Sequence, residues 1–152
     1  MRHLSLFALL FLASVVLADD KKKDDPKKDD KTTKVTGTFT VPKEQMSFDK
    51  LTLEIRLYEY DPKSADKEAE LVDKVEVKDF KHAMGKETVE KFEIGAKGTI
   101  KDGKGYFLTM YVLDGDTRVS RGDASHDAGL GKVLTGGHPR EVKATARQIG
   151  KK

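Results

Sequence analysis

The chain has 152 residues, a length typical of one domain. Charged residues make up 36% and hydrophobic residues 37%, so the protein is rich in charge yet holds enough apolar residues for a core. The net charge of +3 sets 29 basic against 26 acidic residues without a basic stripe carrying aromatics, so we expect no nucleic-acid partner. The absence of cysteine excludes disulfides, thiolate metal sites and a cysteine nucleophile.

Residues 1–18, "MRHLSLFALLFLASVVLA", have the three parts of a signal peptide. Arg2 and His3 form a short basic start, an apolar run follows, and Val16 and Ala18 suit cleavage before Asp19. The apolar run is short for a membrane span. We therefore expect removal near Ala18, a periplasmic or secreted protein, and no stable membrane anchor after cleavage.

Residues 19–33 begin "DDKKKDDPKKDDK", in which blocks of opposite charge alternate. The segment offers almost nothing apolar to bury, which predicts a disordered linker. Because the two signs nearly cancel, a spacer is favoured over an electrostatic grip on a charged surface.

From residue 34 onward, apolar and polar residues alternate with the period of a half-buried strand. The pattern occurs in "KVTGTFTV" (34–41), "KLTLEIRLYEY" (50–60), "KVEVKDF" (74–80) and "TVEKFEIG" (88–95). In the second stretch the parity changes, and a β-bulge near Tyr58 and Glu59 would return Tyr60 to the core side. Residues 61–70 are expected to form a polar connection, and "KHAMGKE" a turn. The expected core positions are Val35, Gly37, Phe39, Val41, Leu51, Leu53, Ile55, Leu57, Val75, Val77, Phe92 and Ile94.

The segment "YFLTMYVLDGDTRVSRG" (106–122) is the clearest strand pair in the chain. Asp114 and Gly115 are a strong hairpin signal, with the returning strand at 117–121. After a glycine-bearing loop, "PREVKATARQI" (139–149) alternates again. These elements predict an all-β fold, an antiparallel β-sandwich of seven to eight short strands over residues 34–149. Its further core positions are Tyr106, Leu108, Met110, Val112, Val142, Ala144 and Ala146.

The order of these pieces resembles a family of small bacterial envelope domains that includes the YbaY lipoproteins and the YscW-type pilotins of type III secretion. The similar pieces are "VTGTFTV", "LEIRLYEYD", "KFEIG", "IKDGKGYFLTMYVLDGDTRV" and "KVLTGGHPREVKA", which span residues 35–146. Unlike the lipoprotein members, this chain has no lipobox cysteine.

The resemblance implies a sandwich-type fold, no enzymatic activity and an accessory role in the envelope. In the pilotin branch that role is assistance to secretin assembly. The resemblance brings no catalytic residues and no cofactor, and we expect no catalytic, cofactor-binding or metal-ligating residues in this chain.

Four short patterns invite other interpretations. Arg121-Gly122-Asp123 matches an adhesion tripeptide, but its place after a predicted strand favours a strand end and turn. His126 and His138 would form a metal site only if the loop between them brought them together. The aspartates nearby do not follow the spacing of a calcium loop, and no nucleophile elbow surrounds the serines.

The strand at 106–113 also offers a more specific surface. If Tyr106 to Val112 face the core, then Phe107, Tyr111 and Leu113 point outward, joined by Tyr58 from a neighbouring strand. An exposed aromatic stripe of this kind is typical of a binding or dimer face. The alternative is that a loop covers it.

The sequence thus predicts an exported, non-enzymatic β-sandwich domain that acts as an envelope accessory or binding protein. Its partner is an envelope protein or a polysaccharide, and its oligomeric state stays open. The alternatives are a carbohydrate- or cell-wall-binding module on the Phe107 and Tyr111 face, and a secreted metal-binding protein using His126 and His138.

Overall fold

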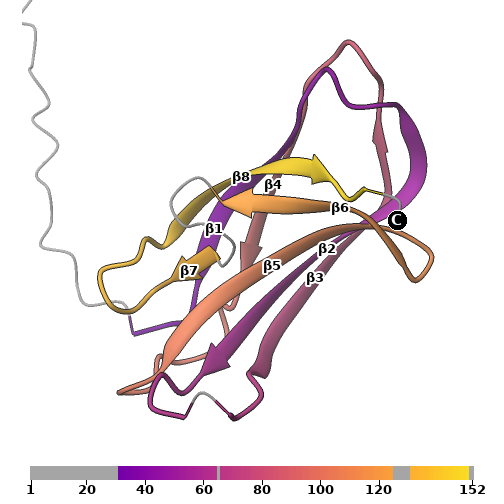
Figure 1. Ribbon diagram of the computed structural model, residues 1–152. Helices are drawn as coiled ribbons and strands as arrows, with labels where there is room; N and C mark the ends of the chain where they lie inside the picture. The colour runs from indigo at the N-terminus through magenta and orange to yellow at the C-terminus, as the bar shows by residue number, and fades with distance from the viewer. Residues whose placement is uncertain (1–30, 65, 125–130, 151–152) are drawn as a thin grey trace, which may run out of the picture. The chain divides into compact units, whose positions relative to one another are not determined.

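A computed structural model describes residues 31–64, 66–124 and 131–150. Its regular elements are all strands (Figure 1): β1 (Val35–Val41), β2 (Phe48–Tyr60), β3 (Glu70–His82), β4 (Thr88–Ile94), β5 (Gly105–Asp114), β6 (Thr117–Ala124), β7 (Gly131–Val133) and β8 (Glu141–Gln148). Over these residues, no helix is both long and apolar enough to cross a membrane. The expected signal peptide, most of the expected linker and His126 lie outside the described residues.

The strands belong to one curved sheet in the order β3-β2-β5-β6-β8-β1-β4, with the short β7 also paired to β5. In Figure 1, β2, β3 and β5 lie together in one layer, and β1, β4, β6 and β8 in the other. The prediction of an all-β fold with seven to eight strands is confirmed. The ladder is antiparallel except between β1 and β8, which run parallel. A parallel pair needs a long connection, and the rest of the domain supplies it.

The two ends of the sheet are β3 and β4, although these strands follow one another in sequence. Residues 83–87 connect them, yet the two strands form no ladder with each other. A connection this short holds the sheet's edges near one another, so the sheet almost closes into a barrel. The expected turn after residue 80 therefore joins two sheet edges.

The inner side of the sheet carries the core that alternation predicts. Fully buried residues come from both layers, and the expected face of β5 is buried along its length. Leu51, Val75 and Val77 are half-buried against this core. The core consists of Val35, Phe39, Val41, Leu53, Ile55, Leu57, Phe80, Phe92, Ile94, Tyr106, Leu108, Met110, Val112, Val133, Val142, Ala144 and Ala146.

A bulge lies near Tyr58 as expected, but its extra residue is on β3 and not on β2. β2 keeps a continuous register with β5, so Glu59 turns into the core and Tyr60 stays on the outer side. The irregularity lies in the pairing of β2 with β3, between Leu57 and Tyr58. The expected return of Tyr60 to the core is therefore wrong, because the extra residue sits on β3.

The packed domain begins before the expected boundary at residue 34. Thr33 is 1% exposed, and its hydroxyl donates to the Gly95 carbonyl at 2.7 Å. The amide of Ile100 donates to the Lys31 carbonyl at 2.7 Å. Residues 31–33, which the charge pattern placed in the linker, are thus part of the fold.

Candidate functional site

A row of side chains crosses the outer side of the sheet from β3 to β7. Leu71 pairs with Tyr58, Tyr58 pairs with Phe107, and Phe107 pairs with Lys132. Directly paired residues point to the same side of a sheet. The row therefore brings apolar groups from three strands together, with a lysine at its end.

The aromatic side chains of this region touch one another. The rings of Tyr58 and Phe107 stack with centroids 5.2 Å apart at 15°, and Tyr60 packs against Phe107 at 5.8 Å. The Tyr60 ring covers Gly105, where a Cβ atom would collide with it. We call Tyr58, Tyr60, Phe107, Tyr111 and Leu113, together with Leu71, the aromatic face. Its β2 and β5 members are half-buried, and Leu71 is 52% exposed.

The sequence pattern did not reveal Leu71. It has the same parity as Val75 and Val77, which would place it in the core. However, Leu57 pairs with Asp73 while Tyr58 pairs with Leu71, so β3 gains one residue at this point. The bulge turns Leu71 outward beside Tyr58. The only sign of this bulge in the sequence was the change of parity on β2, and the extra residue lies on the neighbouring strand β3.

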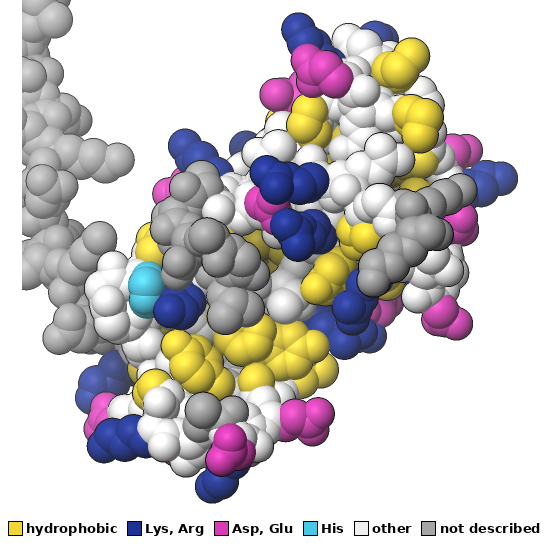
Figure 2. All heavy atoms as spheres, in the orientation of Figure 1, with side chains coloured by type: hydrophobic (Ala, Val, Ile, Leu, Met, Phe, Trp, Pro, Cys, Tyr) yellow, Lys and Arg dark blue, Asp and Glu magenta, His cyan; other side chains and the backbone are white. Residues whose placement is uncertain are grey.

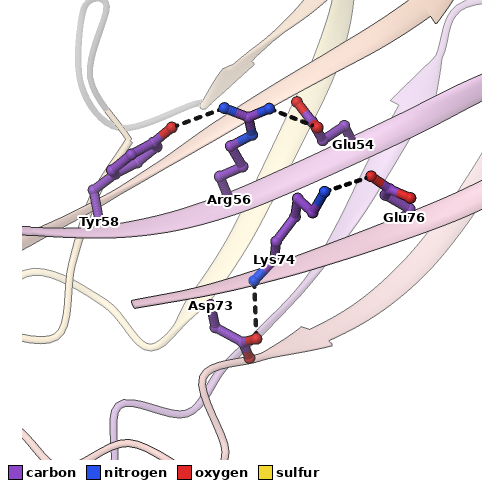
Figure 3. Close-up of polar contacts among 6 residues, drawn as sticks. All are labelled: Glu54, Arg56, Tyr58, Asp73, Lys74 and Glu76. Carbon is purple, nitrogen blue, oxygen red and sulfur yellow. Dashed lines mark hydrogen bonds and ion pairs between the residues drawn. The ribbon is translucent and has the colours of Figure 1, made fainter. Parts of the chain in front are cut away.

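A polar chain extends the aromatic face along β2 (Figure 3). Arg56 lies between Glu54 and Tyr58, with Nη2 donating to Glu54 Oε2 at 2.8 Å and Nη1 to the Tyr58 hydroxyl at 3.3 Å. The hydrogen bond that Arg56 donates to Glu54, and then the one it donates to Tyr58, raise the pKa of Arg56 above its ordinary value. Arg56 therefore stays charged and fixes the Tyr58 hydroxyl.

A second ion pair lies beside this chain on β3. Lys74 Nζ is 2.7 Å from Glu76 Oε1, and this hydrogen bond lowers the pKa of Glu76. Lys74 pairs with Arg56 across the strands, and Glu76 with Glu54. Each strand thus neutralises its own charges, which offsets the like-charge contacts between strands.

Basic residues border the aromatic face on the side of β6 and β8. The Arg118 guanidinium lies 4.2 Å from the centroid of the Tyr111 ring. Arg121 pairs with Tyr111 on one side and with Arg147 on the other. Figure 2 shows hydrophobic side chains gathered over the region of β2 and β5, with dark blue Lys and Arg side chains beside them. We call Arg118, Arg121, Arg147 and Lys132 the basic rim.

The Arg-Gly-Asp tripeptide lies within β6. Arg121 Nε is 3.0 Å from Asp123 Oδ1, and Gly122 faces Met110 and Phe39, where a Cβ atom would come within 2.9 and 3.0 Å. The strand continues to Ala124, beyond the strand end expected from the sequence. An adhesion motif needs a projecting loop, whereas all three residues pair with β8 and Arg121 also pairs with β5.

A groove of about 980 Å³ lies along the seam between β3 and β4. Its apolar lining includes Phe48, Val77 and Phe80. Its rim mixes lysines with acidic residues, and Asp79 on β3 has a positive φ of 54°. Charges and an irregular backbone are common protection for an unpaired strand edge. Met46 and Met84 nearby are exposed by 63% and 64%.

A polar network is built on two buried side chains, Glu59 on β2 and Tyr106 on β5. Tyr106 donates its hydroxyl hydrogen to Glu59 Oε2 at 3.0 Å, and Lys101 Nζ is 3.0 Å from Glu59 Oε1. The backbone amide of Lys101 donates to the Tyr106 hydroxyl at 3.0 Å. Burial raises the pKa of Tyr106, and the hydrogen bond to Glu59 raises that of Lys101. The network anchors the loop 95–104 to β2 and β5.

Of the two histidines in the predicted metal site, the structure describes only His138. His138 lies in the turn before β8, where its amide donates to the Thr135 carbonyl at 3.3 Å. His126 lies outside the described residues. Within the described ranges, no three His, Asp or Glu residues are grouped so that they would hold a metal ion.

Comparison with known proteins identifies a shared fold. No protein-family model matches the chain, and no curated protein matches it. One solved structure is similar, an alternative pilotin from the type II secretion system of Vibrio cholerae. The likeness covers 80% of this chain and 100% of the pilotin, with a TM-score of 0.57 and 15% identity. The described domain therefore has a pilotin-like fold.

Proposed function

We propose that this chain is an exported, non-enzymatic accessory protein of the cell envelope, and that it binds a partner protein through the aromatic face. The signal-peptide pattern of residues 1–18 supports export to the periplasm or beyond. The pilotin-like fold supports an accessory role, in keeping with the resemblance to YbaY and YscW-type domains.

The observation that carries the proposal is the row Leu71, Tyr58 and Phe107. These residues lie side by side on the outer side, while the core fills the inner side. Clustered apolar and aromatic side chains on a solvent-facing sheet are typical of protein-binding surfaces.

A carbohydrate-binding face is the main alternative, and the geometry favours it less. Sugars stack on flat aromatic surfaces, but Tyr58 and Phe107 already cover one another and Arg118 covers Tyr111. Leu71 and Leu113 are aliphatic and have no ring on which a sugar could stack. Aliphatic side chains beside aromatic ones favour contact with protein side chains.

The proposal is tested by capture from a solubilised envelope fraction with the immobilised mature domain. Leu71→Ser removes an exposed apolar side chain from the aromatic face. Val89→Ser is the matched control, because Val89 is 48% exposed on β4. We expect Leu71→Ser to reduce recovery of a specific protein about tenfold or more and Val89→Ser to leave it unchanged. Equal recovery by both variants, or loss only with Val89→Ser, would contradict the proposal.

A further inference from the structure

We infer that the segment docking on the aromatic face is acidic, with carboxylates on the basic rim and an apolar side chain on the Tyr58–Phe107 pair. This inference rests on the proposed function and names the chemistry of its partner. It depends on the balance of charge along β6 and β8.

Among the described residues, the arginines of the basic rim outnumber the carboxylates that pair with them. Arg121 Nε and Arg147 Nε each lie 3.0 Å from a different oxygen of the Asp123 carboxylate. One carboxylate therefore serves two guanidinium groups. In the described part of the chain, Arg118 has no carboxylate within ion-pair distance and rests on the Tyr111 ring.

The repulsion between Arg121 and the Arg147 opposite it is only partly offset by the single Asp123 carboxylate that both contact. Like charges directly opposite each other on neighbouring strands destabilise a sheet. Both side chains are largely solvent-exposed, at 51% and 69%. Local choices that cost stability are concentrated at functional sites. Carboxylates from a partner would relieve the repulsion and pair with guanidinium groups that are held in place.

The aromatic face and the basic rim are continuous. Tyr111 contacts Arg118 and pairs with Arg121, so a segment lying across β5 and β6 would meet rings first and guanidinium groups next. A protein segment that mixes acidic with apolar residues matches both in charge and in polarity. An acidic polysaccharide would match the charges alone.

The test uses the purified mature domain and fluorescent peptides of about ten residues, the upper end of usual strand lengths. One peptide carries phenylalanines in one half and glutamates in the other, and its twin carries glutamine in place of glutamate. Polygalacturonate is the polysaccharide probe. We expect the glutamate peptide to bind about tenfold more tightly than its twin at low salt. Salt should weaken this preference, and Arg118→Gln/Arg121→Gln should abolish it.

Lys91→Gln on the outer side of β4 is the control for loss of one positive charge, and it should leave the preference intact. The inference is overturned if the two peptides bind equally, if neither binds, or if polygalacturonate binds and the peptide does not. Capture from the envelope separates the two proposals. If a partner protein is lost with Leu71→Ser but is still captured by Arg118→Gln/Arg121→Gln, the proposed function stands. The inference that the partner segment is acidic is then refuted.

Discussion

Tyr58 on β2 and Phe107 on β5 stack face to face on the outer side of the sheet, with ring centroids 5.2 Å apart and planes 15° from parallel. Cross-strand pairing places Leu71 on one side of them and Lys132 on the other. The stack is thus the centre of a surface that combines apolar groups with positive charge.

The stack should also contribute to stability. We expect Tyr58→Ala and Phe107→Ala to show a coupling of about 0.5–1.5 kcal/mol in a double-mutant cycle by urea unfolding. Tyr58→Ala combined with Val89→Ala should be additive within about 0.5 kcal/mol, because Val89 lies on a distant strand. A coupling near zero would mean that the two rings do not interact in solution.

The parallel pairing of β1 with β8 depends on Gly37. A Cβ atom there would collide with the Val142 carbonyl and lie 2.7 Å from Phe92 Cζ. We expect Gly37→Ala to lower the free energy of unfolding by about 2 kcal/mol, measured by chemical denaturation. Gly150→Ala is the control, because no atom lies within 4 Å of its added methyl group. Equal stability of the two variants would argue against this pairing.

The hydroxyl of Tyr106 joins Glu59 to the 95–104 loop. Tyr106→Phe removes a donor from the buried carboxylate and an acceptor from the Lys101 amide, so we expect a loss of about 1–3 kcal/mol in the free energy of unfolding. Tyr111→Phe removes a hydroxyl that is not hydrogen-bonded within the described part of the chain, and it should change stability by less than about 0.5 kcal/mol. A Tyr106→Phe protein as stable as wild type would contradict the network.

The raised pKa of Tyr106 predicts a pH dependence. Burial favours the neutral phenol, so the folded state holds its proton to higher pH than the unfolded chain does. The resulting stabilisation is complete below the ordinary tyrosine pKa near 10 and is lost as pH rises through the folded value. The stability advantage of wild type over Tyr106→Phe should therefore shrink above about pH 10. An advantage that grew with alkaline pH would have the wrong sign.

Alternation in the sequence was sufficient to predict the strands and most of the core. Tyr106, Leu108, Met110 and Val112 are all buried, as their spacing predicts. Burial imposes this pattern strand by strand, so it can be seen in one sequence. The outward direction of Phe107 and Tyr111 follows from the same parity.

The rest depends on how strands pair, and one sequence does not contain that information. Leu71 reaches the aromatic face through a bulge, and Glu59 enters the core because Tyr106 and Lys101 satisfy its carboxylate. Arg121 and Arg147 are far apart in sequence and meet only because β6 pairs with β8. The basic rim could therefore not be predicted without the order of the strands in the sheet.

The most direct test of the proposed binding surface is photo-cross-linking from position 107. Benzoylphenylalanine in place of Phe107 keeps an aromatic ring on the aromatic face, and the same group in place of Val89 reports on β4. With an envelope fraction, we predict a cross-link to one specific protein from position 107 that is absent from position 89. Cross-linking at position 107 no stronger than at position 89, or to polysaccharide alone, would contradict the proposal that this face binds a protein.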